Sequence, residues 1–211
     1  MKKREVQDAI ESFRMKTAYG SCDDCFPPWF LHHMYQLSET ELMRQSSEGH
    51  KGGLNNYDFG IDAYHIEMSD SKCKLIIIQA KNSSSLNYIS RAYNELKRAL
   101  PTIKDIIHKI TFGGQLQNKV IVNLRSDLNR LTESQRNSLR IEFIIIHLCE
   151  EDPVIISNKT KNTKESLKES IETIFPDTDY SLKNISPQDM GAQQEIRAKE
   201  SPQNNLVKFI K

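Results

Sequence analysis

The sequence predicts an α/β fold, with a mixed β-sheet flanked by helices and preceded by an N-terminal helical lead-in. Helical patterns fill roughly the first fifty residues, two short apolar runs follow closely, and a third apolar run comes after a long helical segment. Helices and strands in this order are typical of α/β proteins. With 211 residues, 37% hydrophobic and 27% charged, the chain can bury a core of useful size.

Three helices are expected in the lead-in, residues 1–49. Apolar side chains at helical spacing, among them Val6 and Ile10, predict an amphipathic helix over the first 19 or so residues. Pro28 suits the first turn of a second helix. Ser38 and Glu41 have the spacing of a capping box that opens a third helix, with Gly49 as its stop.

Two short runs rich in β-branched and aromatic residues, 61–68 and 73–80, predict an antiparallel hairpin because only a few polar residues separate them. A long helical region follows, interrupted at Pro101 and again at Gly113-Gly114. Residues 140–149 have the apolar run of a central strand, and residues 152–160 suggest another strand.

Residues 163–175 predict a last helix, with Thr163 as its cap. The core is therefore expected over 50–175. Residues 176–211 are polar and are expected to be peripheral or partly ordered.

Charge and cysteine content exclude some classes of protein. The net charge of +1 points to no partner, but residues 82–141 hold ten Lys/Arg against four Asp/Glu, which suits either a nucleic-acid-facing side or a solvated helical surface. The basic start leads into an amphipathic pattern rather than a signal peptide, and no apolar run approaches a membrane span. Four cysteines in a chain of this length predict no disulfide framework, so we expect a cytoplasmic protein without a membrane partner.

A cluster of polar side chains is expected at one end of the hairpin. Gln79 and Lys81 lie two positions apart on one strand, so they face the same side of the sheet. Asp62 begins the neighbouring strand and should lie opposite them. Hard divalent cations take oxygen ligands, which Asp62, Gln79 and the Ala80 carbonyl can offer. Lys81 can orient an attacking water or neutralise a developing oxyanion. A divalent cation and a lysine placed together in this way suit phosphodiester hydrolysis.

The motif "DFGIDAYHI" followed by "LIIIQAK" resembles the active-site core of the PD-(D/E)xK nuclease superfamily, in the Q-x-K form of Mrr-like restriction endonucleases. The chain from about residue 27 to 100 is most similar to the N-terminal part of abortive-infection phage-resistance (AIPR) proteins. This resemblance implies a restriction-endonuclease-like core and a metal-dependent DNA endonuclease in prokaryotic anti-phage defence. It implies Asp62 as a metal ligand and Gln79 and Lys81 as the Q-x-K pair. It also implies Asp58, the upstream acidic position of the loop, as a further metal ligand.

The expected cofactor is Mg²⁺ or Mn²⁺, and the expected partner is DNA, with RNA not excluded and a homodimer as one arrangement of the chain. Arg91, Lys97 and Arg98 follow on the next helix and are candidate phosphate contacts, with a solvated helix face as the alternative. Superfamily members often carry a glutamate on the first core helix. The nearest glutamates here are Glu11 and Glu48.

Two rival functions stay open. One is a catalytically inactive nuclease fold that binds nucleic acid or a protein partner, and the other is a protein-interaction module. A zinc site at Cys22-x2-Cys25 and His32-His33 is disfavoured, because the adjacent histidines point to different faces of a helix.

Overall fold

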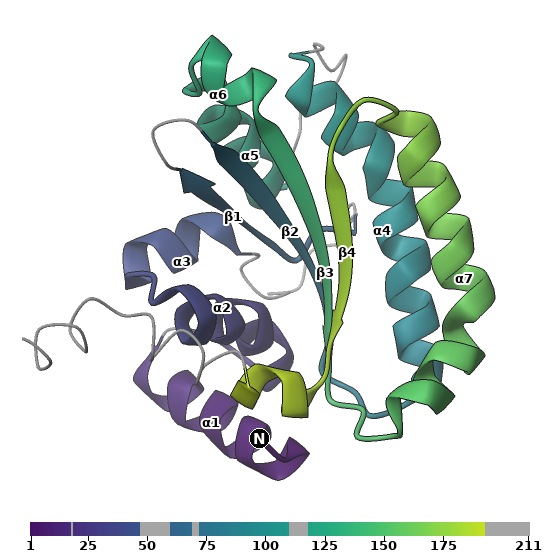
Figure 1. Cartoon of the computed structure of the whole chain (residues 1–211). Helices are drawn as coiled ribbons and strands as arrows, with labels where there is room; N and C mark the ends of the chain where they lie inside the picture. The colour runs from purple at the N-terminus through teal and green to yellow at the C-terminus, as the bar shows by residue number, and fades with distance from the viewer. Residues whose placement is uncertain (18, 47–59, 69–71, 110–117, 193–211) are drawn as a thin grey trace, which may run out of the picture.

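The computed structural model describes residues 1–17, 19–46, 60–68, 72–109 and 118–192. The chain forms an α/β structure in which helices cover both faces of a four-stranded sheet (Figure 1). The α/β class expected from the sequence is therefore confirmed. Among the described residues, no helix is long and apolar enough to span a bilayer. All four cysteines are free thiols.

The sheet is mixed, and its strands lie in the order β1-β2-β3-β4. Strands β1 (Ala63–Met68) and β2 (Cys73–Lys81) form the antiparallel hairpin that the sequence predicts, with Ala63 opposite Ile78. Strands β3 (Leu139–His147) and β4 (Tyr180–Ile185) extend the sheet in parallel. The predicted central strand at 140–149 is β3.

Strand β2 is apolar because both of its faces are covered. Leu75 and Ile77 pack into one hydrophobic cluster, while Ile76 and Ile78 pack into another on the opposite face. The period of two in a strand sends alternate side chains into the two clusters. Gln79 and Lys81 continue the parity of Leu75 and Ile77, so they belong to the face covered by α4.

Helices α1 (Lys3–Lys16), α2 (Cys22–Tyr35) and α3 (Glu39–Gln45) cover one face. The predicted capping box of Ser38 and Glu41 opens α3. The predicted start of α2 at Pro28 is wrong, because Ser21 accepts a hydrogen bond from the Asp24 N–H at 3.2 Å and starts the helix earlier. Pro27 and Pro28 lie inside α2 and are buried.

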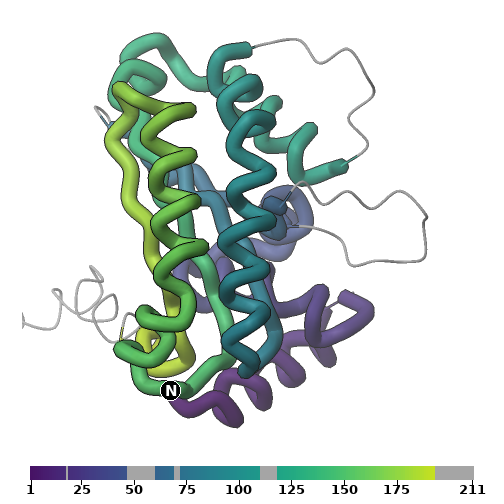
Figure 2. The backbone as a smooth tube through the Cα atoms, turned by 90° about the vertical axis from the view of Figure 1, so that its right-hand side faces the viewer, coloured from purple at the N-terminus to yellow at the C-terminus, as the bar shows by residue number. Residues whose placement is uncertain are grey.

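Helices α4 (Leu86–Ile107), α5 (Lys119–Asn129) and α7 (Pro153–Ile174) contribute to the cluster on the other face, and the short helix α6 (Glu133–Asn137) precedes β3. Figure 2 shows α4 and α7 side by side. Pro101 lies within α4 rather than interrupting it.

The strand suggested over 152–160 is wrong. Asp152 caps the Val154 N–H at 2.7 Å, and Pro153 occupies the first turn of α7. Short apolar runs fit a strand or a buried helix equally well, and here the cap chemistry decides for a helix. Thr163, the expected cap, lies inside α7.

The polar C-terminal region contains a strand that the sequence pattern did not reveal. β4 pairs with β3 along the open edge of the sheet, and Ile185 and Met190 are buried among the residues of α1 and α2. An edge strand is only partly covered, so its composition stays polar. Residues 193–211 lie outside the described part of the chain.

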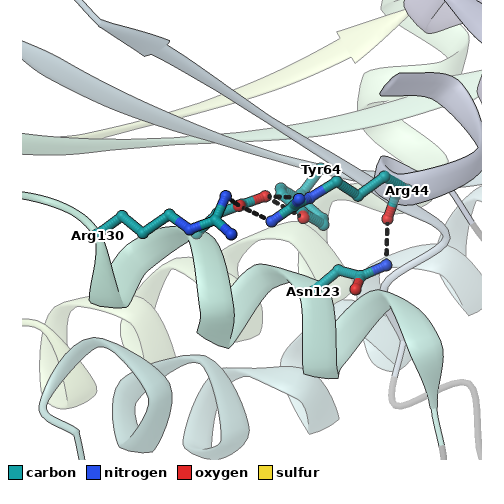
Figure 3. A network of polar contacts seen from close by, with 5 residues as sticks. Arg44, Tyr64, Asn123 and Arg130 are labelled. Atoms are coloured by element: carbon teal, nitrogen blue, oxygen red, sulfur yellow. Dashed lines mark hydrogen bonds and ion pairs between the residues drawn. The ribbon is translucent and has the colours of Figure 1, made fainter. Parts of the chain in front are cut away.

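A polar network ties α3, β1 and α5 together (Figure 3). The Asp127 carboxylate accepts a 2.6 Å hydrogen bond from the buried Tyr64 hydroxyl and pairs with Arg44 and Arg130. The Asn123 amide donates to the Arg44 carbonyl at 2.9 Å. Burial raises the pKa of Tyr64 well above its usual value, so the hydroxyl keeps its proton for Asp127. The network holds β1 in place two residues after Asp62.

Candidate functional site

Asp62 lies directly before β1 and turns its carboxylate toward β2. Its N–H donates to the Ile78 carbonyl at 2.9 Å, which extends the pairing of the hairpin by one residue. One carboxylate oxygen, Oδ2, accepts from the Ala80 N–H at 2.6 Å and from the Gln79 amide at 2.7 Å. The antiparallel register therefore brings Asp62 and Gln79 into direct contact, as expected from a short hairpin.

The Gln79 side chain is fully buried between two carboxylates. Its Nε2 donates to Asp62 at 2.7 Å and to Oε2 of Glu95 at 3.2 Å. A carboxylate only accepts hydrogen bonds when ionised, so the nitrogen end of the amide must face both. The buried Oε1 accepts no hydrogen bond from any described residue. A buried oxygen that accepts no hydrogen bond is unfavourable unless another donor or a cation reaches it.

Glu95 on α4 is the residue of this cluster that the sequence analysis missed. Its Oε2 accepts from Gln79 and pairs with Lys81, and its Oε1 accepts from Arg91 Nε at 2.6 Å. Glu95 is buried on the helix face that also carries Ala92 and Ala99. A glutamate within the apolar stripe of an amphipathic helix is the signal that could have found it.

Gly60 lets the chain approach this glutamate. It has φ +71°, and a Cβ there would lie 2.1 Å from the Glu95 carbonyl oxygen. Only glycine combines that left-handed backbone with so close an approach. The glycine that precedes Ile61 and Asp62 in the sequence thus places the Asp62 segment against the Glu95 turn of α4.

Lys81 is joined to the other two predicted residues through Glu95. Its side chain is only 16% exposed and pairs with Oε2 of Glu95, the oxygen that also accepts from Gln79. The predicted residues Asp62, Gln79 and Lys81 thus lie in one hydrogen-bonded group, with Glu95 as a fourth member. Burial in such a group strengthens each electrostatic contact relative to water.

Two other predicted ligand positions have different outcomes. Asp58 lies outside the described residues. Ala80 contributes its N–H to Asp62, and the role predicted for its carbonyl stays a prediction.

Of the three predicted phosphate contacts on α4, Arg91 and Arg98 lie on one exposed face, and Lys97 lies apart from them. Arg91 is exposed and bonded to Glu95. Lys97 donates to Ser166 on α7 at 2.8 Å, so it lies between two helices and apart from the group around Gln79. Arg98 is exposed, seven residues beyond Arg91 on the same helix.

The cysteine pair on α2 is not arranged as a metal centre. The Cys22 thiol donates to Glu11 at 3.0 Å, and this hydrogen bond raises the pKa of Cys22. Burial raises the pKa of Cys25 to about 11. Thiols that bind metals must lose their protons, which both environments oppose. Glu11 itself bonds Arg14 and Cys22, while Glu48 lies outside the described residues.

In the part of the chain that the structure describes, no three His, Cys, Asp or Glu side chains form a group that could hold a metal ion. The candidate site thus contains two described carboxylates, Asp62 and Glu95, with the Gln79 amide between them. No protein-family model, curated protein or solved structure matches this chain.

Proposed function

We propose that this protein is a divalent-metal-dependent nuclease with a PD-(D/E)xK-type core that hydrolyses phosphodiester bonds in DNA. The observation that carries the proposal is the environment of Gln79. Its fully buried amide bridges the carboxylates of Asp62 and Glu95, and its Oε1 accepts no hydrogen bond from the described residues. A polar oxygen buried beside two carboxylates suits a hard cation such as Mg²⁺ or Mn²⁺.

Asp62 and Glu95 would hold the cation, and Oε1 of Gln79 would join them if the amide turned its oxygen, in place of Nε2, toward the two carboxylates. Two carboxylates and one amide oxygen are the donor types that hard divalent ions prefer, with substrate phosphate oxygens and water completing the coordination. A bound cation would supply Lewis acidity, polarising the phosphate and lowering the pKa of an attacking water.

The remaining chemistry belongs to Lys81. Its ammonium lies on the same face of β2 as Gln79 and is held by Glu95. From there it can orient a water molecule or offset negative charge that develops on the phosphate. A role in prokaryotic anti-phage defence is proposed only from the resemblance of the motif to AIPR proteins.

A second candidate is a catalytically inactive module that binds nucleic acid. It is favoured by the limited number of described metal ligands, since no three His, Cys, Asp or Glu residues of the described chain form a metal-binding group. It is also favoured because Lys81 and Arg91 already pair with Glu95.

Nicking of supercoiled plasmid separates the two candidates. The purified protein should nick DNA with Mg²⁺ or Mn²⁺ and not with excess EDTA, and Asp62→Asn should abolish nicking. Glu142→Gln is the matched control, because Glu142 is a buried carboxylate of the same sheet that pairs with Lys183 instead. Salt-dependent DNA binding without cleavage would support the inactive module. Nicking that survives Asp62→Asn would reject the proposed site.

A further inference from the structure

Arg91 joins the solvent-exposed surface of α4 to the buried group around Gln79. Its side chain is 66% exposed, whereas the Glu95 side chain to which it bonds is 11% exposed. The other cation on Glu95, Lys81, is 16% exposed. Of these two cations, Arg91 is the one that a macromolecule approaching α4 would meet first.

The described group is already balanced in charge. The formal negative charges of Asp62 and Glu95 are matched by the formal positive charges of Lys81 and Arg91. Both oxygens of Glu95 are engaged, Oε1 by Arg91 and Oε2 by Lys81 and Gln79. A divalent cation that enters this group meets two like charges and a carboxylate whose oxygens are occupied. The two positive charges offset the attraction that the two carboxylates exert on the cation, which weakens its binding.

We propose that Arg91 couples the binding of nucleic acid to the binding of the divalent cation. This inference rests on the proposed nuclease function. A backbone phosphate that reaches α4 draws the Arg91 guanidinium away from Glu95, which releases Oε1 and removes one positive charge from the site. Arginine suits this exchange because its guanidinium fits carboxylate and phosphate equally well. The Arg91 end of the pair is exposed to solvent, so the guanidinium can turn from Glu95 to a phosphate and remain paired.

The ligand class follows from the position of Arg91 on the helix. Its exposed stripe carries Asn87, Asn94 and Arg98, at intervals of three or four residues. Amide and guanidinium groups in a row can follow a phosphodiester backbone, because phosphate contacts need donors and positive charge rather than a base sequence. Arg91 is therefore a positioning residue that acts through Glu95.

Coupling of this kind is reciprocal. If nucleic acid raises the affinity for Mg²⁺ by some factor, Mg²⁺ must raise the affinity for nucleic acid by the same factor. The protein would then load its cation mainly when substrate is present.

Isothermal titration of Mg²⁺ into the protein, with and without a short phosphorothioate DNA duplex that resists cleavage, tests the proposal. The unchanged protein should bind Mg²⁺ about tenfold more tightly with the duplex. Arg91→Met should bind Mg²⁺ more tightly than the unchanged protein when the duplex is absent, and the duplex should add little. Arg91→Lys should restore part of the coupling because the charge returns.

Arg98→Met is the matched control, since it removes the same charge from the same helix face seven residues away. It should weaken duplex binding but leave the coupling factor unchanged. Coupling that survives in Arg91→Met would overturn the role of Arg91 while leaving the proposed function intact, and so would equal Mg²⁺ affinity of the unchanged protein with and without duplex. Failure of the unchanged protein to bind either Mg²⁺ or duplex would overturn both. Circular dichroism and melting curves of each variant show that it is folded.

Discussion

Gln79 donates a 2.7 Å hydrogen bond to the Asp62 carboxylate from the adjoining strand, although the two residues lie 17 positions apart in the sequence. The same nitrogen reaches Glu95 on α4 at 3.2 Å. A neutral amide thus separates two carboxylates that would otherwise repel each other in a buried place.

Replacing the amide by a third carboxylate tests its role directly. The carboxyl introduced by Gln79→Glu should have a pKa above that of an ordinary glutamate, because Asp62 and Glu95 are beside it and the position is buried. The variant should therefore lose stability as the pH rises through that raised pKa, and Mg²⁺ should restore it. Differential scanning fluorimetry with EDTA or Mg²⁺, combined with calorimetric titration, measures both effects.

Gln135→Glu is the control for this change. It adds the same charge at the capping box of α6, where a glutamate can accept the same hydrogen bond from Thr132. If Gln79→Glu gains neither Mg²⁺ affinity nor stabilisation by Mg²⁺, Gln79 does not ligate the cation.

Glu95→Gln tests the residue whose place in the candidate site is shown only by the structure. The substitution keeps the size of the side chain but removes the charge that pairs with Lys81 and Arg91. We expect plasmid nicking to fall about as far as in Asp62→Asn, by roughly a hundredfold or more, because each variant loses one charged ligand. Activity close to that of the unchanged protein would show that Glu95 serves stability alone.

Gly60→Ala should disturb the contact between the Asp62 segment and α4. The added Cβ would lie 2.1 Å from the Glu95 carbonyl oxygen, on a backbone with φ +71°. A residue in such a conformation costs about 1–3 kcal/mol, and the contact adds to this. Urea unfolding measures the loss.

Gly20→Ala is the matched control for Gly60→Ala. The nearest atom to its added Cβ is a side-chain oxygen of Asp24 at 3.7 Å, which is an ordinary contact. A free energy of unfolding for Gly60→Ala within about 0.5 kcal/mol of that control would contradict the close approach.

His147 should make stability depend on pH. Burial lowers its pKa from 6.5 to about 4, and its Nδ1 accepts the Cys149 N–H at 3.0 Å. The unfolded chain therefore takes up a proton near pH 6.5 that the folded chain takes up only near pH 4. The free energy of unfolding should fall as the pH drops through this window, by at most roughly 3 kcal/mol from this residue.

Urea unfolding between pH 7 and pH 4 measures this dependence. His147→Gln should flatten the slope, whereas His108→Gln, at an exposed position after α4, is the control. An unchanged slope in His147→Gln would assign the dependence to other groups.

Much of the candidate site follows from local rules that the sequence carries. The period of two along β2 puts Gln79 and Lys81 on one face, and a short antiparallel hairpin puts Asp62 opposite Gln79. The capping box of Ser38 and Glu41 likewise identifies the start of α3. These features depend on neighbours a few residues away or on the short turn between two strands, so the order of side chains in the sequence is sufficient to predict them.

Other features depend on contacts between distant segments. α4 runs through Pro101 because its apolar stripe packs on the sheet and on α7, and that packing brings Glu95 onto the face of Gln79. β4 becomes a strand because β3 offers it an open edge, although its own sequence is polar. Local propensity is worth only fractions of a kcal/mol per residue, whereas burial and edge pairing add up over whole elements. The local pattern thus predicts the helix that carries Glu95, whereas packing across the fold decides that Glu95 meets Gln79.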